Sequence, residues 1–326
     1  MTAMDLKLVE EGTLAPQTQS RTFLYHAETA FLITKSDIKT TILPATTFAF
    51  TAVFSGLMSD ATTPDASSAL FGLLKAVVWT WVNLWIFNLS NQRLPNSVLE
   101  DAINKPWRAI PSGRLTPEEA SQILLLSIPA GYLSTLFLGG TTEFLVMMVL
   151  TWVYNDLGAA EGHFLLRHVN NALGFTTFGA GAARVACGGA LNTTTIYAWL
   201  AVIAAAITCT IQFQDMEDQE GDRLRARKTL PLVMGEGATR WANAVTVVGF
   251  SLVAAAFWRL PVLGYLPPAA LGGLIAVRTL TRTDLAGDKQ TFKLWCLWLM
   301  LLYVLPFAKM EGVWDIGFGA GSLVAL

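Results

Sequence analysis

The sequence predicts an all-α membrane protein with about nine transmembrane helices in one bundle. Of its 326 residues, 53% are hydrophobic and only 14% are charged, and the mean hydropathy is +0.48. This composition is too apolar for an ordinary soluble domain. Nine apolar segments approach the roughly 17 to 25 residues that a bilayer-spanning helix needs. They cover residues 40–58, 69–88, 118–138, 142–158, 169–189, 195–213, 241–258, 261–280 and 292–308.

The order of these segments indicates a duplication. The second segment ends in a polar stretch, residues 89–116, and the sixth ends in another, residues 214–237. A Pro or Gly break and a new helix start follow each of them. We therefore expect two four-helix repeats plus a ninth helix, forming a single transmembrane domain over residues 40–326 after an amino-terminal arm over residues 1–39. The glycine-rich fifth segment suits a tightly packed interior helix.

The distribution of basic residues predicts the orientation. Most of the 22 lysines and arginines fall in the amino-terminal arm and in the loops after the second, fourth, sixth and eighth segments. Because cytoplasmic loops collect Lys and Arg, the arm and both polar stretches are expected in the cytosol. The arm lacks an apolar core with a cleavage site, so no cleavable signal peptide is expected. Cys187, Cys209 and Cys296 lie in predicted spans without metal-binding spacing and are expected to be packing residues.

The second polar stretch carries the sharper chemical pattern. Asp215, Asp218 and Asp222 are spaced i, i+3, i+7 directly after the sixth segment. If that helix continues for one or two turns, the three carboxylates share one face, and bound cations would relieve their repulsion. Arg223 and Lys228 follow, so the stretch combines groups that bind divalent metal with groups that bind phosphate. The alternative is a solvated cytosolic loop, the usual fate of a charge run.

The first polar stretch is less regular. Asn88 and Asn91 share a helix face, and Pro95 is expected to break or kink the helix there. The remaining candidates lie beyond that break. They are Glu100, Asp101, Lys105 and Arg108. Acids beside bases again predict a site for Mg2+ and diphosphate at the rim of the bundle, although a simple cytosolic turn shaped by the prolines is the alternative.

These residues resemble the UbiA superfamily of intramembrane prenyltransferases. Its second motif, D-x-x-D-x-x-G-D followed by a basic residue, is similar to Asp215-Met-Glu-Asp218-Gln-Glu-Gly-Asp222-Arg223. Its first motif reads N-D-x-x-D-x-x-x-D followed by R-P-x-x-x-G, and this chain keeps Asn91 and the stretch from Arg108 to Gly113. The resemblance covers nearly the whole chain.

The first motif also departs from that pattern. Gln92, Pro95 and Leu99 stand at its three aspartate positions, so Glu100 and Asp101 must substitute. The stretch from Glu100 to Arg108 looks like that of fungal membrane-bound terpene cyclases in this superfamily. This resemblance implies that Mg2+ bridges a prenyl diphosphate to the motif side chains. The implied metal ligands and catalytic residues are Asn91, Glu100, Asp101, Asp215, Asp218 and Asp222, and the implied diphosphate-binding residues are Lys105, Arg108, Arg223 and Lys228.

The allyl cation produced from such a substrate needs a dry pocket with electron-rich walls. Residues near the cytosolic ends of the second, fourth and sixth segments can supply it. The candidates are Asn88, Trp81, Trp85, Phe87, Tyr154 and Phe213. Aromatic residues at membrane interfaces are also common anchors, so we expect only two or three of them to line a cavity.

Three function classes fit these patterns. The first is a terpene cyclase that ionises farnesyl or geranylgeranyl diphosphate and closes the cation on itself. The second is a prenyltransferase that uses an aromatic or other small acceptor. The third, a secondary transporter, fits poorly because the charges lie at the rim and not at the midplane. We expect a multi-pass protein of the endoplasmic reticulum that meets the lipid bilayer and a prenyl diphosphate, with neither nucleic acid nor an obligatory protein partner.

Overall fold

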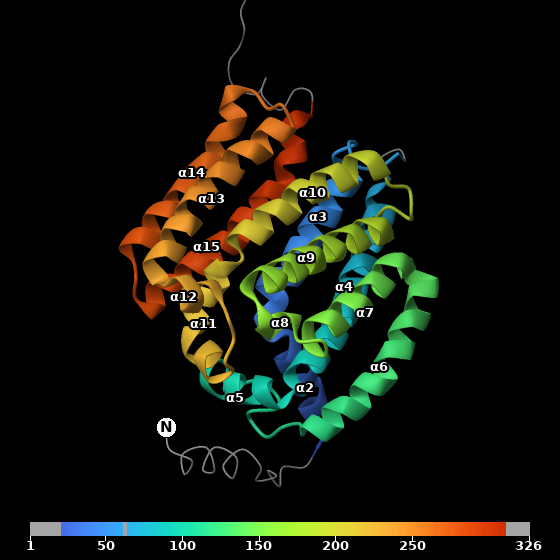
Figure 1. The fold of residues 1–326 in the computed structure, drawn as a ribbon. Coiled ribbons are helices and arrows are strands. Elements are labelled where there is room, and N and C mark those ends of the chain that lie inside the picture. Colours follow the sequence, from blue (N-terminus) through green and yellow to red (C-terminus); the bar gives the residue numbers. More distant parts are fainter. Residues whose placement is uncertain (1–20, 61–63, 311–326) are drawn as a thin grey trace, which may run out of the picture.

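The computed structural model describes residues 21–60 and 64–310, and each regular element in these ranges is a helix (Figure 1). The predicted all-α fold is therefore confirmed. The elements of the first half are α2 Phe23–Thr34, η1 Lys35–Asp37, η2 Ile38–Ile42, α3 Leu43–Phe54, α4 Ala66–Gln92, α5 Pro95–Asn104, α6 Pro117–Leu138, α7 Thr141–Asn155 and α8 Ala159–Gly162. Those of the second half are α9 Phe164–Ala186, α10 Thr193–Thr210, α11 Gln212–Leu224, α12 Leu230–Met234, α13 Glu236–Phe257, α14 Val262–Thr281, α15 Leu285–Val304 and η3 Leu305–Lys309.

Each of the nine predicted segments coincides with a helix, namely α3, α4, α6, α7, α9, α10, α13, α14 and α15. Among the described residues, six stretches are long and apolar enough to cross a membrane: α4, α6, α10 with α11, α13, α14, and α15 with η3. Helices α3 and α7 have only 12 and 15 residues. The chain is therefore an integral membrane protein, and the number of nine crossings stays a prediction.

Local chemistry explains where the helices begin and end. Thr116 caps α6, since its hydroxyl accepts a hydrogen bond from the Glu119 amide at 3.1 Å, and the Glu119 carboxylate accepts one from the Thr116 amide at 3.0 Å. This reciprocal capping box fixes the start of α6 at Thr116 and Pro117. Gly235, with φ of 85°, separates α12 from α13 in a conformation that glycine adopts without cost.

Two hydrophobic clusters form the core, and α9 lies between them. One cluster joins residues of α4, α6 and α7 to α3 and α9, and the other joins α10, α13, α14 and α15 to the same two helices. The clusters separate close to the predicted halves. The ninth helix, α15, packs against α3 from the first half as well as against α14.

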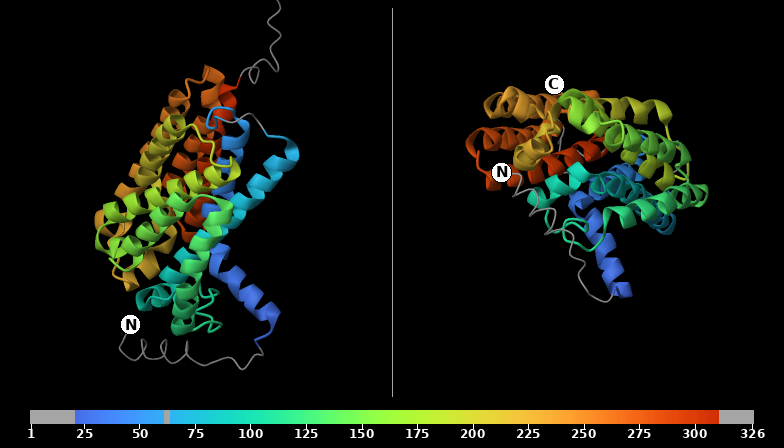
Figure 2. Two further views of the ribbon diagram at one scale, coloured as in Figure 1. Left: turned by 90° about the vertical axis from the view of Figure 1, so that its right-hand side faces the viewer. Right: turned by 60° about the horizontal axis from the view of Figure 1, so that its bottom comes forward.

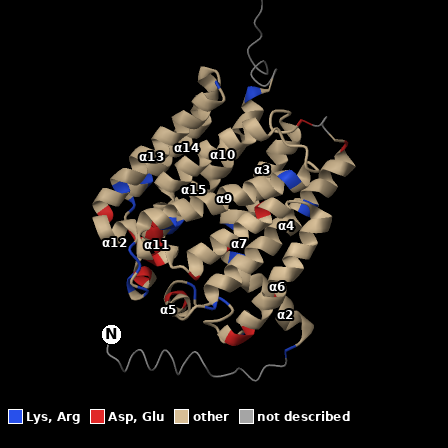
Figure 3. Ribbon diagram, turned by 45° about the vertical axis from the view of Figure 1, so that its right-hand side comes forward, with Lys and Arg blue, Asp and Glu red and all other residues tan. Residues whose placement is uncertain are grey.

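Charged residues concentrate at one end of the bundle. Helices α2, α5, α11 and α12 lie at this end, while the loops between α3 and α4 and between α9 and α10 lie at the other (Figures 1 and 2). Acidic and basic residues gather around α5, α11 and the turn before α12, whereas the long helices are mostly uncharged (Figure 3). Helix α2 leaves the bundle at an angle and forms part of the predicted arm.

Candidate active site

The two polar stretches meet at the charged end of the bundle. Helix α4 ends at Gln92, and after a short turn Pro95 is the first residue of α5. The predicted break of the helix at Pro95 is therefore confirmed. Helix α11 continues α10 after a single intervening residue. A Cβ on Gly221 of α11 would collide with the side chain of Asn104, whose amide donates to the Asp218 carbonyl at 3.2 Å. The predicted convergence of the two stretches is confirmed by this contact between α5 and α11.

Within this region the carboxylates of α5 are neutralised by arginines. Asp101 accepts two hydrogen bonds from Arg108, at 2.8 and 2.9 Å. Glu100 accepts one from Arg225 at 2.9 Å and one from Arg227 at 2.8 Å. All five side chains are buried, so each charge depends on its partner for stabilisation.

The aspartates of α11 are paired in the same way. Asp215 forms an ion pair with Arg167 of α9, and the His168 Nε2 lies 3.6 Å from its other oxygen. Asp222 pairs with Arg227 at 3.1 Å, the same arginine that holds Glu100. The pair nearest to solvent is the one in which the Lys105 ammonium lies 3.4 Å from Asp218. The predicted acidic face of α11 is thus a buried charge network in this arrangement.

These neighbours shift the pKa values of the α5 carboxyls in opposite directions. Burial of Glu100 favours its neutral form, but the charge of Arg227, helped by other basic neighbours, outweighs burial and lowers the pKa of Glu100. At Asp101 burial dominates and raises the pKa, although the charge of Arg108 opposes it. Glu100 therefore stays charged more readily than Asp101.

The arrangement of the carboxylates on α5 and α11 shows how well they suit a metal ion. Among the residues that the structure describes, no three Asp, Glu, His or Cys side chains lie close enough together to hold a metal ion. However, the Oδ2 atoms of Asp215 and Asp222 are buried there without a hydrogen-bond partner. Carboxylate oxygens are the ligands that Mg2+ prefers, so the donor set fits this ion. To bind Mg2+, Asp215 and Asp222 would have to exchange part of their contacts with Arg167 and Arg227 for contacts with the ion.

The predicted diphosphate-binding residues separate into two groups. Lys105 and Arg108 belong to the charge network, as described above. Arg223 is exposed and donates to Gln219 at 3.3 Å, and the Lys228 side chain is exposed after the α11 turn. The structure also places the amide of Asn91 on the Asn155 oxygen at 2.8 Å.

The candidates predicted from the sequence did not include Arg225, Arg227, Arg167 or His168. The turn after α11 explains the omission of Arg225 and Arg227. Ala226 has φ of 55°, in the left-handed region that non-glycine residues seldom adopt. The chain reverses there, so Arg225 and Arg227 return to α5. The basic run from residue 223 to 228 was visible in the sequence, but which of its members turn inward was not.

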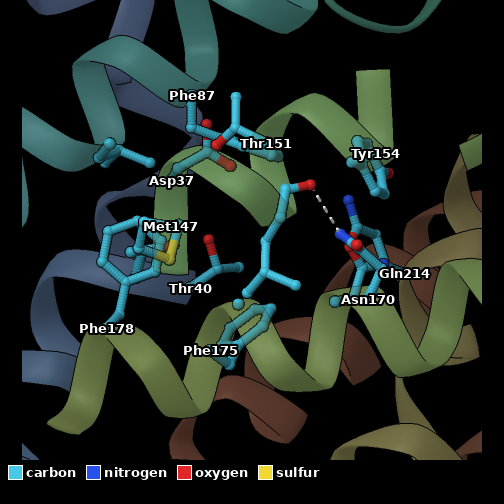
Figure 4. Close-up of a pocket in the computed structure, with 15 residues that line it drawn as sticks. Asp37, Thr40, Phe87, Met147, Thr151, Tyr154, Asn170, Phe175, Phe178 and Gln214 are labelled. Atoms are coloured by element: carbon cyan, nitrogen blue, oxygen red, sulfur yellow. Dashed lines mark hydrogen bonds between the residues drawn. The ribbon is translucent and has the colours of Figure 1, made fainter. Parts of the chain in front are cut away.

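An apolar cavity lies beside the charge network, among α4, α7, α9 and η2 (Figure 4). It holds about 680 Å³ of space between protein atoms, including its opening. Leu84, Phe87, Met147, Phe175 and Phe178 supply apolar walls, and Tyr154, Asn170 and Gln214 supply polar groups. Figure 4 shows these three polar residues on the side away from Met147 and Phe178. Such a concave, mostly apolar cavity with a few polar groups is typical of a small-molecule site.

A second, more polar cavity adjoins the first, and we call it the mouth. Three residues, Asp37, Thr40 and Gln214, line both cavities. The mouth is rich in lysine. Its basic residues are Lys35, Lys39, Lys105, Lys289 and Lys293. Glu217 and Asp37 are its only acids within the described ranges, so the mouth carries an excess of positive charge.

Two of the six residues predicted to line a substrate pocket do so. Phe87 and Tyr154 line the apolar cavity, with their rings 5.6 Å apart. The other four do not line this cavity, and the expectation was that only two or three of the candidates would. The indole of Trp81 donates a hydrogen bond to Thr34 at 3.4 Å, and that of Trp85 donates one to Ser127 at 3.0 Å. Phe213 belongs to the core cluster of the second half. The Asn88 amide donates a hydrogen bond to the Ile33 carbonyl at 3.0 Å. A helix end gives depth in the membrane, but only helix rotation decides which aromatic side chains face inward.

Comparisons with known proteins find relatives that match most of the chain. The chain is 31% identical over 303 residues to the diterpene cyclase eriG of Hericium erinaceus, covering 89% of this chain and 90% of the relative. It is 26% identical over 287 residues to the fumagillin beta-trans-bergamotene synthase of Aspergillus fumigatus, covering 87% and 94%. It is also 28% identical over 291 residues to the somaliensene A/B synthase of Streptomyces somaliensis, covering 86% and 92%.

Solved structures share the fold. A digeranylgeranylglyceryl phosphate synthase matches with a TM-score of 0.58 at 14% identity, over 86% of this chain and 98% of the other. A UbiA homologue of Archaeoglobus fulgidus, bound to GPP and Mg2+, matches with a TM-score of 0.54 at 11% identity, over 85% and 99%. The UbiA prenyltransferase family matches residues 47–305. The chain therefore belongs to the UbiA prenyltransferase family.

Proposed function

We propose that this protein is a membrane-embedded, Mg2+-dependent terpene cyclase that ionises a prenyl diphosphate and closes the resulting cation on itself. The observation that carries the proposal is that Asp37, Thr40 and Gln214 line both the apolar cavity and the mouth, so that the two cavities adjoin. An apolar chain fits the first cavity while its diphosphate occupies the lysine-rich mouth. Three relatives named as a terpene cyclase or terpene synthases, each matched over most of its length, support the same reading.

In this proposal the basic side chains bind the diphosphate directly, and the carboxylates bind it through Mg2+. Lys105 lines the mouth and already lies 3.4 Å from Asp218, so it is placed to exchange that contact for a phosphate oxygen. Asp215, Asp218 and Asp222 would hold Mg2+, with Asn91, Glu100 and Asp101 as further oxygen ligands. When bound, Mg2+ supplies Lewis-acid stabilisation of the departing diphosphate. Arg108, Arg223 and Lys228 remain candidates for the same negative charge.

The cavity walls would then protect the cation. Phe87, Phe175 and Phe178 present aromatic rings around the space, and ring faces attract cations. The apolar residues between them keep water away from the reacting chain, which prevents early capture of the cation. These side chains favour cyclisation inside the cavity.

The alternative function is transfer of the prenyl group to an aromatic or other small acceptor. The polar side of the cavity, formed by Tyr154, Asn170 and Gln214, is the observation that favours it, because such groups can orient an acceptor. The chain is also 28% identical to the polyprenyl transferase eriF of Hericium erinaceus, over 81% of this chain. We further propose that the protein lies in the endoplasmic reticulum with the mouth facing the cytosol, as the basic residues at that end favour.

An acceptor-free assay distinguishes the two functions. We expect detergent-solubilised protein with Mg2+ and farnesyl or geranylgeranyl diphosphate to release diphosphate and form a cyclic hydrocarbon, identified by gas chromatography with mass detection. EDTA should abolish both products, and added Mg2+ should restore them. A prenylated product that forms only after an aromatic acceptor is added would contradict the cyclase and support the transferase.

A further inference from the structure

Asp37 is the one acidic side chain that lines the apolar cavity among the described residues. A carboxylate beside apolar walls in a membrane protein costs free energy, and such residues usually serve a function. Its position adds to this argument, because Asp37 also lines the mouth. It therefore lies where a prenyl chain in the cavity would join a diphosphate in the mouth.

The backbone at this position is irregular. Asp37 ends the short 3-10 turn η1 and directly precedes the π-helical turn η2, which together join α2 to α3. Single π-helical turns inside a longer helix are rare in proteins, and those that occur are often found at functional sites. The irregular turn presents Asp37 and Thr40 to the cavity, where Figure 4 shows Asp37 beside Phe87 and Thr151.

The two oxygens of Asp37 have different surroundings. Its Oδ2 accepts hydrogen bonds from the Ser36 hydroxyl at 2.8 Å and the Asn88 amide at 3.0 Å, and Arg108 lies 3.7 Å away. Within the described part of the chain, its Oδ1 accepts no hydrogen bond. One oxygen is thus held in place while the other keeps its lone pairs available.

We propose that Asp37 is the base that ends the cyclisation by accepting a proton from the carbocation, an inference that rests on the proposed function. A C–H bond next to the cationic carbon breaks, and its electron pair forms the carbon–carbon double bond. The proton goes to Asp37 Oδ1 and then to the diphosphate in the mouth, which restores the carboxylate. The substrate is thereby converted into a cyclic olefin and protonated diphosphate, so atoms and charge balance.

The other polar groups of the cavity are weaker bases. Tyr154, Asn170 and Gln214 offer a phenol and two amides, and the remaining polar residues are threonines and a second asparagine. A fixed carboxylate selects which of several C–H bonds is broken, because proton transfer requires direct contact. Asp37 therefore determines the position of the double bond as well as the end of the reaction.

The test compares diphosphate release with product identity in Asp37→Asn. Asparagine keeps the shape and can still accept the hydrogen bonds from Ser36 and Asn88, but it cannot take the proton. With Mg2+ and a prenyl diphosphate and no acceptor, we expect the yield of the main wild-type olefin per diphosphate released to fall at least tenfold. Isomeric olefins or alcohols from water capture should replace it in the chromatogram.

Asp60→Asn provides the matched control, because Asp60 lies in the loop after α3, at the opposite end of that helix, and lines neither cavity. Its product profile should match the wild type. An unchanged product profile in Asp37→Asn would overturn the proposal, as would a parallel loss of diphosphate release and olefin in a folded variant.

If Asp37→Asn does not fold, Asp37→Glu retains the base but moves it by one methylene. A changed ratio of olefins in that variant supports the proposal, and a wild-type ratio overturns it. The proposed function fails separately if the wild-type protein itself releases no diphosphate without an acceptor.

Discussion

The Glu100 carboxylate accepts hydrogen bonds from Arg225 and Arg227, which lie 125 and 127 positions later in the sequence. Arg225 also donates to Ser97 at 2.7 Å and to Glu161 at 2.9 Å, so it joins α5, α8 and the turn after α11. Removing one partner of a buried ion pair costs about 3 to 5 kcal/mol, because the other charge remains buried without compensation. The network therefore contributes to keeping the two motif regions together.

This pairing predicts a pH dependence for Glu100→Gln. Because its folded-state pKa lies below the ordinary value of 4.5, the Glu100 carboxylate stabilises the folded protein above pH 4.5, and this contribution is lost as the pH falls through the lower folded value. We expect the substitution to lower the free energy of unfolding by about 3 kcal/mol near pH 7. The difference from wild type should shrink steadily below pH 4.5.

Thermal unfolding in detergent across this pH range measures the effect. Arg223→Met is the control, since Arg223 is exposed and makes one hydrogen bond with the described residues, at 3.3 Å, so its unfolding temperature should match wild type at every pH. A difference between Glu100→Gln and wild type that stays constant down to pH 3 would contradict the assigned pairing.

At the scale of the elements, α9 owes its central place to small residues. A Cβ at Gly181 would collide with the indole ring of Trp79 on α4, which is itself buried. Close approach of helices through glycine is the usual means of tight packing in membranes. The predicted role of the glycine-rich fifth segment as an interior helix is thereby confirmed.

Gly181→Ala is expected to destabilise the protein by about 1 to 3 kcal/mol, because an extra methyl group overpacks this contact. Gly174→Ala on the same helix is the matched control, since nothing lies within 4 Å of the added atom. The measurement is the unfolding temperature of both purified variants. Equal losses in the two variants would show that helix α9 does not depend on the contact with Trp79.

At the scale of the whole molecule, the mouth is assembled from opposite ends of the chain. Lys35 and Lys39 precede α3, whereas Lys289 and Lys293 lie one turn apart on α15. The described residues form no ion pair with these four lysines, although Lys35 and Lys39 lie 4.7 Å from the ring centres of Trp107 and Phe292. Like charges one turn apart repel, so a bound polyanion would stabilise the arrangement.

The double variant Lys289→Met with Lys293→Met should weaken diphosphate binding by at least about tenfold, since hydrogen bonds to charged groups contribute roughly 1.5 kcal/mol or more. Competition by inorganic pyrophosphate in the presence of Mg2+ measures this effect. Lys75→Met is the control, because Lys75 lies on α4 against Phe71 and away from the mouth. Unchanged pyrophosphate affinity in the double variant would remove α15 from the site.

Much of the fold could be predicted because membrane helices are determined locally. Apolar length, the capping pattern at Thr116 and the break at Pro95 each depend on neighbouring residues. The candidate site was less accessible to such reasoning. The motif spacing singled out Asp215, Asp218 and Asp222, but the sequence could not show which of the aromatic candidates face the cavity, because a small rotation of a helix moves a side chain from the interior to the periphery.

The sequence alone determined that this protein is a helical membrane protein with two charged stretches that follow apolar helices, since composition and periodicity act over short distances. Only the tertiary structure decided which charges pair, that Asp37 faces the apolar cavity, and that lysines from both ends of the chain share one mouth. Those features depend on contacts between residues far apart in the chain. Helix rotation and packing fix such contacts, and no local pattern records them.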